Sequence, residues 1–335
     1  MYRSSGYCSR GIGLAVGSEN RDAVLFGYNG GMRTADDQWD IASSVGWTAL
    51  MVAAGRAVET HRADGLVDDP YAEDFVARAQ TPQPLPTRPE QRWPDAERVG
   101  DERTVMDELW SVMCTYQGIR SRFFDTVLAT AAGDGVDQVV LLAAGLDARA
   151  LRLDWPTGTT LFELDQAGVL EFKDAVLAET GAAPRCDRRR IAVDLREDWP
   201  AALRAAGFDP GRPSAWLAEG LLPFLPAGAE AELFERIGAL AAPGSTITVE
   251  HFGSVVDRFR DDPAVARFGS PFGVDMSSLV FVEERDGPGP ADRLGRDAWS
   301  VRVHTPLELA ERYRRALPAL STGTELDSQL ITARR

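Results

Sequence analysis

Short apolar runs alternate with amphipathic helical patterns along the second half of the chain. Such runs predict buried strands, and they occur at residues 138–144, 159–164, 190–193, 214–217 and 245–250. Between them, apolar positions recur at helical spacing, which predicts helices at 168–179, 200–206 and 228–240. Strands that alternate with helices imply right-handed βαβ units. The sequence therefore predicts an α/β fold with a doubly wound, mostly parallel sheet.

The first half of the chain is predicted to be helical, because amphipathic spacing extends over residues 44–58, 69–79 and 103–132. Segment 80–94 contains five prolines. It cannot hold a helix, so we expect either a lid over a site or a disordered loop. Residues 1–31 are rich in glycine and show no sustained period, which predicts a mobile tail.

One folded domain is therefore expected over residues 32–335, with a helical portion at 32–134 and an α/β core at 135–335. Within the core, residues 252–300 contain many Gly, Pro and Asp residues and are interpreted as a mostly looped insertion on the substrate side. A helix at 305–316 and a strand at 329–333 are predicted to complete the fold.

The composition limits which partners the protein can be expected to bind and in which cellular compartment it can be expected to act. The 335 residues carry 36 basic and 51 acidic side chains, a formal net charge of −15, which argues against nucleic acid as a partner. The cysteines, Cys8, Cys114 and Cys186, are far apart and form no metal-binding motif, so we expect free thiols and no metal site. No apolar run approaches the roughly 18 residues of a membrane span. We therefore expect a cytoplasmic protein without a membrane partner.

Acidic residues and one glycine stand at the ends of the predicted strands, where open α/β sheets bind their ligands. Gly145 follows the first strand, and Asp165 ends the second, 20 residues later. That spacing is typical of an acidic residue that reaches the ribose in nucleoside-binding folds. Asp194 and Glu219 end the third and fourth strands. Asp165 and Asp194 could instead cap the helices that follow them.

The dinucleotide-binding pattern G-x-G-x-x-G is incomplete, because Ala143, Gly145 and Ala148 occupy its three glycine positions. The segment that follows has room for only about two helical turns before the second strand. A cofactor without bridging phosphates fits this turn better than a dinucleotide does. S-adenosyl-L-methionine is the candidate nucleoside cofactor.

At this point the chain resembles the class I S-adenosyl-L-methionine-dependent methyltransferases related to the leucine carboxyl methyltransferases, and most closely their actinobacterial O-methyltransferase branch. The resemblance is carried by seven short segments that follow one another in the expected order: 44–49, 69–72, 120–125, 144–150, 162–166, 192–195 and 216–222. It implies a Rossmann-like methyltransferase fold. It also implies a set of cofactor-binding residues: Arg120 on the methionine carboxylate, Gly145 along the methionine part, Asp165 on the ribose, Asp194 and Leu195 at the adenine, and Glu219 beside the cofactor near the acceptor.

The predicted activity is methyl transfer to a carboxylate or hydroxyl oxygen of an unidentified small-molecule acceptor. A carboxylate is already a nucleophile at neutral pH, whereas a hydroxyl would benefit from a general base. His251, after the fifth strand, is the candidate for that base, while His61 and His304 are expected at the surface. The alternative interpretations are a non-catalytic nucleoside-binding interaction module and, with less support, an NAD-dependent oxidoreductase.

Overall fold

A computed structural model describes residues 44–79, 81–95, 98–100, 103–252, 267–274, 288–318 and 327–335 of the chain. The predicted tail at 1–31 lies outside these ranges, as do residues 253–266 and 275–287 of the predicted insertion. None of the helices within the described ranges is both long enough and apolar enough to cross a membrane.

The described residues form one seven-stranded sheet with the strand order β3-β2-β1-β4-β5-β7-β6. Strands β1 to β5 are parallel, and β7 pairs antiparallel with both β5 and β6. This confirms the predicted α/β fold with a mostly parallel sheet. The strands are β1 Gln138–Leu142, β2 Thr160–Asp165, β3 Asp187–Ala192, β4 Ser214–Ala218, β5 Thr246–Phe252, β6 Ser300–His304 and β7 Ser328–Arg334.

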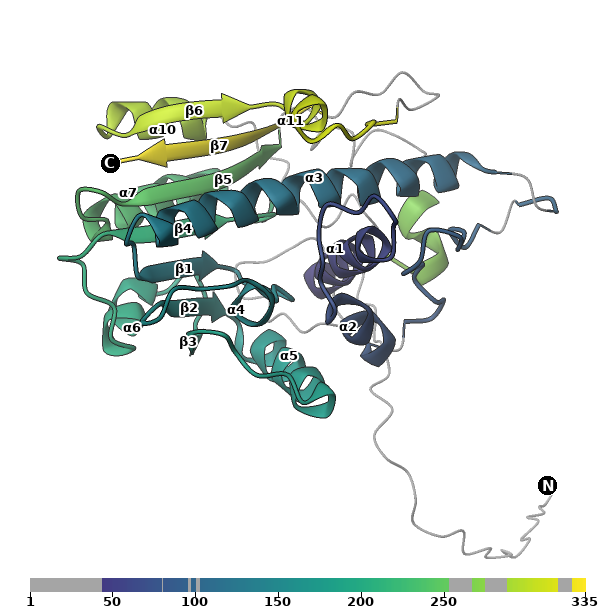
Figure 1. The fold of residues 1–335 in the computed structure, drawn as a ribbon, viewed down its shortest axis with the longest axis horizontal. Helices are drawn as coiled ribbons and strands as arrows, with labels where there is room; N and C mark the ends of the chain where they lie inside the picture. Colours follow the sequence, from purple (N-terminus) through teal and green to yellow (C-terminus); the bar gives the residue numbers. More distant parts are fainter. Residues whose placement is uncertain are drawn as a thin grey trace, which may run out of the picture.

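Helices cover both faces of the sheet, and the N-terminal helices lie beyond the carboxyl ends of its parallel strands (Figure 1). Helix α3 crosses one face, and α6 and α7 lie behind the other. The helices are α1 Ser44–Thr60, α2 Ala72–Arg78, α3 Val105–Gly133, α4 Arg149–Arg152, α5 Ala167–Thr180, α6 Trp199–Ala205, η1 Leu222–Phe224, α7 Ala227–Leu240, η2 Ser270–Phe272, α10 Pro290–Arg296 and α11 Pro306–Tyr313.

Two apolar cores form on the two faces because side chains alternate along each strand. Leu141 and Leu217 point into the core under α1 and α3, whereas Val140 and Trp216 point into the core under α6 and α7. The central strands are buried on both faces. This explains their continuous apolar runs, which are typical of parallel strands covered by helices.

Helix α3 is 29 residues long and begins at a capping box, in which Thr104 and Asp107 each accept from the other's backbone N–H. Asp107 also accepts from the backbone N–H of Trp93 at 2.9 Å. Trp93 is buried and stacks on Phe268 with ring centroids 3.8 Å apart. The proline-containing segment therefore packs against the N-terminal part of α3 as a loop, and neither helix nor strand occurs in its described part, residues 81–94.

The structure adds strand β6, which the sequence analysis missed. Its sequence, Ser-Val-Arg-Val-His, alternates in polarity and lies at the exposed edge of the sheet, so it lacks the continuous apolar run of a buried strand. Strand β3 begins at Asp187, three residues before the predicted start. The first residues of β3 are charged and do not form an apolar run, so the sequence analysis began the strand later. In the fold, Glu163 and Asp174 neutralise Arg188.

The turn after β1 places two residues in the left-handed region, Ala143 with φ of 50° and Gly145 with φ of 48°. Glycine adopts this conformation freely, whereas a residue with a Cβ atom does not. The turn therefore keeps the conformation that glycine favours even though Ala143 stands in it.

We expect Ala143→Gly to stabilise the protein by about 1 kcal/mol. Relief of the left-handed conformation returns about 1–2 kcal/mol, which exceeds the roughly 0.4–1 kcal/mol that the extra freedom of glycine costs in the unfolded chain. Thermal unfolding should show a rise in Tm of about 2 °C. Ala148→Gly is the matched control, because Ala148 has a φ of −112°, and it should lower Tm. A fall in Tm for both variants would contradict the prediction.

Candidate active site

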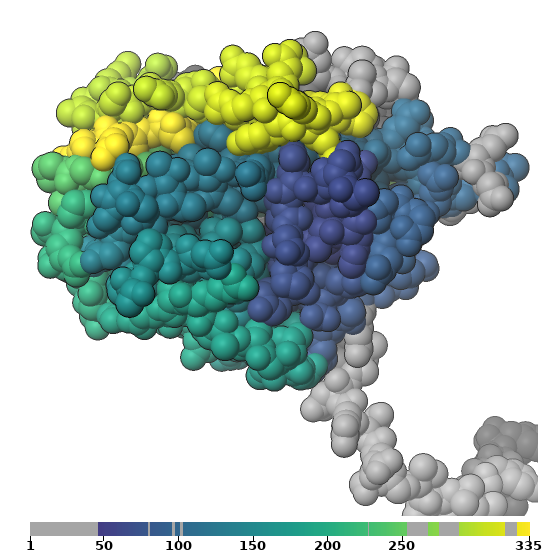
Figure 2. All heavy atoms as spheres, viewed as in Figure 1, coloured from purple at the N-terminus to yellow at the C-terminus, as the bar shows by residue number. Residues whose placement is uncertain are grey.

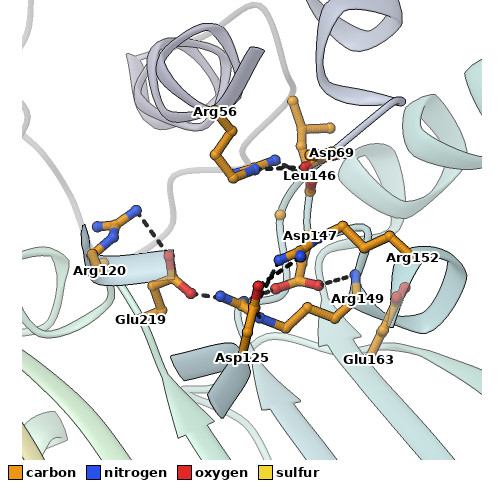
Figure 3. A network of polar contacts seen from close by, with 12 residues as sticks. Arg56, Asp69, Arg120, Asp125, Leu146, Asp147, Arg149, Arg152, Glu163 and Glu219 are labelled. Carbon is orange, nitrogen blue, oxygen red and sulfur yellow. Dashed lines mark hydrogen bonds and ion pairs between the residues drawn. The ribbon is translucent and has the colours of Figure 1, made fainter. Parts of the chain in front are cut away.

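The candidate site lies at the carboxyl edge of the parallel strands. Gly145, Asp165 and Glu219 follow or end β1, β2 and β4, which are neighbours in the sheet. Helix α3 brings Arg120 to the same edge, where it pairs with Glu219 (Figure 3). The structure thus joins these predicted residues in two direct contacts, Gly145 with Asp165 and Arg120 with Glu219.

Asp165 links the ends of β1 and β2. Its Oδ2 accepts from the backbone N–H of Gly145 at 2.6 Å, and its Oδ1 accepts from that of Gln166 at 2.7 Å. Burial raises the pKa of Asp165, against the opposing effect of these two hydrogen bonds. Helix α5 is capped by Gln166 without any side-chain cap bond. The alternative role of Asp165 as a helix cap is therefore wrong.

Asp194 is also not a helix cap, because Asp198 caps α6 by accepting from Ala201. The carboxylate of Asp194 instead accepts from the backbone and guanidinium of Arg196. It also accepts from Gln166 Nε2 at 3.3 Å, which connects it to the residue after Asp165. Leu195 packs half-buried against the apolar core under α6 and α7.

Arg120 is buried, although an arginine on a helix would ordinarily be solvated. Its side chain is 3% exposed, and its Nη atoms lie 2.9 Å from Glu219 Oε1 and 2.6 Å from Glu250 Oε2. Burial disfavours the charged guanidinium, but the two carboxylates more than compensate and raise its pKa. Arg120 therefore stays charged between two acidic residues of neighbouring strands.

Glu250, at the end of β5, is one of the residues at the site that the sequence analysis missed. Its Oε1 accepts from the Tyr116 hydroxyl at 2.5 Å, and its Oε2 accepts from Arg120 and from the backbone N–H of Gly220 at 2.7 Å. Gly220 has a φ of 61°. Burial raises the pKa of Glu250 despite the opposing charge of Arg120. The strand-end rule applied to β1 to β4 would have found it on β5.

Glu219 extends the network toward α4. Its Oε2 accepts from Arg149 Nη1 at 2.8 Å. Arg149 also pairs with Asp147 and, through Nε at 2.7 Å, with Asp125. Asp147 is thus a partner of Arg149. Burial by itself would raise the pKa of Asp147, but the charges of Arg149, Lys173 and Arg152 lower it to about 2.

The single turn of α4 holds a second arginine against Asp125. Arg152 donates through Nη1 and Nη2 to the two carboxylate oxygens of Asp125, at 2.7 and 2.8 Å. The connected group thus contains three arginines and four acidic residues, 3 − 4 = −1 in formal charge: Arg120, Arg149, Arg152, Asp125, Asp147, Glu219 and Glu250. The candidate site is therefore lined by a network with a slight excess of negative charge.

Helix α1 is fastened to the same edge by a buried arginine. Arg56 donates through Nη2 to the carbonyl of Leu146 at 2.7 Å and through Nε to Asp69 at 2.8 Å. Figure 3 shows both contacts above the arginine and carboxylate network. This contact fixes α1 against the turn that contains Gly145.

The histidines lie away from the network. Glu250 contacts α3 on one face of β5, so the next residue, His251, points toward the opposite face. His61 is exposed and pairs with Glu73 at 2.9 Å, and His304 packs its ring on Phe123 with centroids 5.2 Å apart. Within the described ranges, no group of three or more His, Cys, Asp or Glu residues could hold a metal ion.

We expect Glu250→Ala to destabilise the protein by about 3–5 kcal/mol, because it leaves the buried guanidinium of Arg120 with one carboxylate fewer. Tyr116→Phe removes one hydrogen bond to a charged group and should cost about 1.5–3 kcal/mol. Urea unfolding measures both losses. A cost below about 1 kcal/mol for Glu250→Ala would show that Arg120 does not depend on it.

Acid should weaken the fold through Asp147. Its pKa in the folded protein is about 2, below the ordinary 3.8. Its ion pair therefore stabilises the protein fully above pH 4, and that contribution, about 2 kcal/mol, is lost as the pH falls toward 2. Asp147→Asn should lower the unfolding free energy at pH 7 by this amount and flatten its decline between pH 4 and 2. An unchanged slope would contradict this role.

Comparison with known sequences shows the family of the chain. Residues 49–238 match the family described as leucine carboxyl methyltransferase. A protein of Rhodococcus jostii strain RHA1 is 50% identical over 292 residues, covering 86% of this chain and 94% of its own. A protein of Saccharopolyspora erythraea is 43% identical over 306 residues, covering 90% of this chain and 99% of its own. Both carry the name of a proposed S-adenosyl-L-methionine-dependent methyltransferase.

Solved structures show weaker similarity. A crystal structure of a methyltransferase-like protein from Thermobifida fusca matches with a TM-score of 0.44 at 16% identity, covering 68% of this chain and 82% of its own. The family match and the sequence relatives, and not this similarity, decide the assignment. They confirm the resemblance inferred from the seven short segments: the chain belongs to the leucine carboxyl methyltransferase family of S-adenosyl-L-methionine-dependent methyltransferases.

Proposed function

We propose that the protein is an O-methyltransferase that transfers the methyl group of S-adenosyl-L-methionine to an oxygen atom of a small-molecule acceptor. The observation that carries this proposal is the arrangement at the carboxyl edge. There, Asp165 is fixed by the Gly145 backbone and Glu219 is fixed by two arginines. Family membership supports the reaction class, and this geometry supports the proposed cofactor-binding residues.

The residues at the edge fit the cofactor in charge and in space. S-adenosyl-L-methionine carries a carboxylate, an ammonium and a sulfonium group, a net charge of +1, which complements the excess of one negative charge in the network. A Cβ atom built on Gly145 would meet no atom closer than 3.8 Å, so its backbone can be approached closely. The Nε atom of Arg120 is buried without a hydrogen-bond partner, which leaves one donor for a carboxylate.

The residues that would hold the cofactor are those implied by the family resemblance: Arg120, Gly145, Asp165, Asp194, Leu195 and Glu219. When bound, the cofactor supplies a methyl group that its sulfonium already activates. The protein therefore mainly has to bind and orient the two reactants and to exclude water. The buried network suits that task, because its side chains are held by ion pairs before any ligand arrives.

The placement of the histidines favours a carboxylate acceptor over a hydroxyl acceptor. A hydroxyl oxygen would gain from a nearby base, but His251 points to the other face of β5, and His61 and His304 lie elsewhere. A carboxylate needs no base. We therefore propose a carboxylate as the methyl acceptor and retain a hydroxyl as the second candidate.

The turn after β1 gives less support to an NAD-dependent oxidoreductase. Helix α4 is a single turn of four residues, Arg149–Arg152. A pyrophosphate is ordinarily bound at the N-terminus of a full helix, whose dipole and free N–H groups stabilise it. A non-catalytic nucleoside-binding module would use the same residues, so only turnover separates it from the enzyme.

We further propose that the protein acts in the cytoplasm and has no nucleic-acid or membrane partner. The described cysteines, Cys114 and Cys186, are free thiols, which supports a reducing compartment. Arg188, Arg189 and Arg190 pair with carboxylates of the protein itself, which leaves them poorly suited to bind phosphates of a nucleic acid.

Binding of the cofactor is tested by thermal unfolding with S-adenosyl-L-methionine, S-adenosyl-L-homocysteine or NAD. At a hundredfold excess over Kd, a bound ligand should stabilise the fold by about 2.7 kcal/mol, and only the two sulfur nucleosides should do so. Asp165→Ala should abolish the shift. Asp154→Ala is the matched control, because Asp154 is exposed and pairs only at the surface.

Turnover is then tested with S-adenosyl-L-methionine labelled in its methyl group and a panel of matched carboxylic acids and alcohols. Label in a base-labile methyl ester supports a carboxylate acceptor, and label in a base-stable ether supports a hydroxyl acceptor. Cofactor binding without transfer to any member of the panel favours the interaction module. Stabilisation by NAD alone would overturn the proposal.

A further inference from the structure

A hollow of about 570 Å³ lies beside the candidate active site, between the loop that joins α1 and α2, the second half of α3, and α4. Figures 1 and 2 show these elements side by side on one face of the molecule. The volume is within the range of small-molecule sites, about 300–1,000 Å³. None of the six proposed cofactor-binding residues lines this hollow.

Arginines give the hollow a cationic lining. Arg122, Arg152 and Arg185 line it against two acidic residues, Asp68 and Asp125. Arg122 is exposed and forms no ion pair with any carboxylate in the described ranges. Within the described ranges, the carboxylate that pairs with Arg185 is that of Asp154, which is 96% exposed. Such a surface pair is weak, so Arg185 is available to another anion. This lining contrasts with the net charge of −15 of the whole chain.

A buried donor without a partner points in the same direction. The side chain of Arg152 is 5% exposed and binds Asp125 through both Nη atoms. Its Nε atom is buried and has no hydrogen-bond partner. Leaving a buried donor unpaired costs free energy. Because Arg152 lines the hollow, an anionic group there would lie beside a guanidinium that still has an unpaired donor.

The remaining wall is largely apolar. Leu66, Val67 and Tyr71 from the α1–α2 loop face Leu151 and Leu153 from the segment around α4. A small inorganic ion would leave this surface uncovered. The hollow therefore fits an anion attached to an apolar or aromatic body better than it fits a free ion.

We propose that this hollow binds a small organic anion, with its carboxylate or phosphate group on Arg122 and Arg152 and its apolar body against the leucines and Tyr71. The site is separate from the strand edge but connected to it. Asp125 accepts from Arg152 on the side of the hollow and from Arg149 on the side of Glu219. The proposal does not depend on the identity of the methyl acceptor.

The test is isothermal titration calorimetry of the full chain with phenyl phosphate, benzoate, inorganic phosphate and phenol. We expect phenyl phosphate and benzoate to bind, phenyl phosphate to bind more tightly than inorganic phosphate, and phenol not to bind. Arg122→Glu should weaken binding of phenyl phosphate by about tenfold or more. This variant should fold, because Arg122 is exposed and takes no part in the buried network.

The control is Arg296→Glu on α10, an exposed arginine far from the hollow with the same change of charge, which should leave the affinity unchanged. Binding should also persist when S-adenosyl-L-homocysteine is present in excess. Equal affinity of Arg122→Glu and the unchanged protein would overturn the proposal. So would competition between phenyl phosphate and S-adenosyl-L-homocysteine without any effect of Arg122→Glu, because the anion would then lie at the strand edge. Failure of all the probes to bind would also overturn it.

Discussion

The buried guanidinium of Arg120 is the interaction on which the carboxyl edge of the sheet depends. A charge removed from water requires opposite charges and hydrogen bonds in good geometry, or it destabilises the fold. Here the compensation comes from Glu219 at the end of β4 and Glu250 at the end of β5, while Arg120 itself is on α3. One ion-pair group therefore fixes the position of a long helix relative to two neighbouring strands.

Buried ion pairs connect secondary-structure elements elsewhere in the molecule as well. Glu163 on β2 is buried and pairs with Lys173 on α5 at 3.0 Å and with Arg188 on β3 at 2.7 Å. Glu59 on α1 is buried and pairs with Arg315, which follows α11. Glu163 thus connects three consecutive elements, whereas Glu59 connects two that are distant in the sequence. The chain as a whole is acidic, but its buried carboxylates are paired with basic side chains.

The fold and much of the candidate site could be predicted from the sequence because both depend on short, local signals. Apolar runs predicted the central strands. Because open α/β sheets bind ligands at the ends of their strands, Gly145, Asp165 and Glu219 were predicted at the site. Edge strand β6 could not be found this way, since an exposed edge has no continuous apolar run. The burial of Arg120 could not be predicted from the sequence either, because it depends on Glu250, which is 130 residues away along the chain. Long-range charge pairing leaves no periodic pattern in a sequence.

Burial of the network has a consequence for the response to dissolved salt. At physiological ionic strength counter-ions screen exposed charges over about 8 Å, but they act much less on pairs that solvent does not reach. The pair of Arg185 and Asp154 is exposed and should weaken as salt rises, whereas Arg120 and Glu250, which are 3% and 0% exposed, are shielded by the protein itself. The geometry of the strand edge should therefore change little between dilute buffer and brine, while ion pairs on the outer surface should weaken as salt rises.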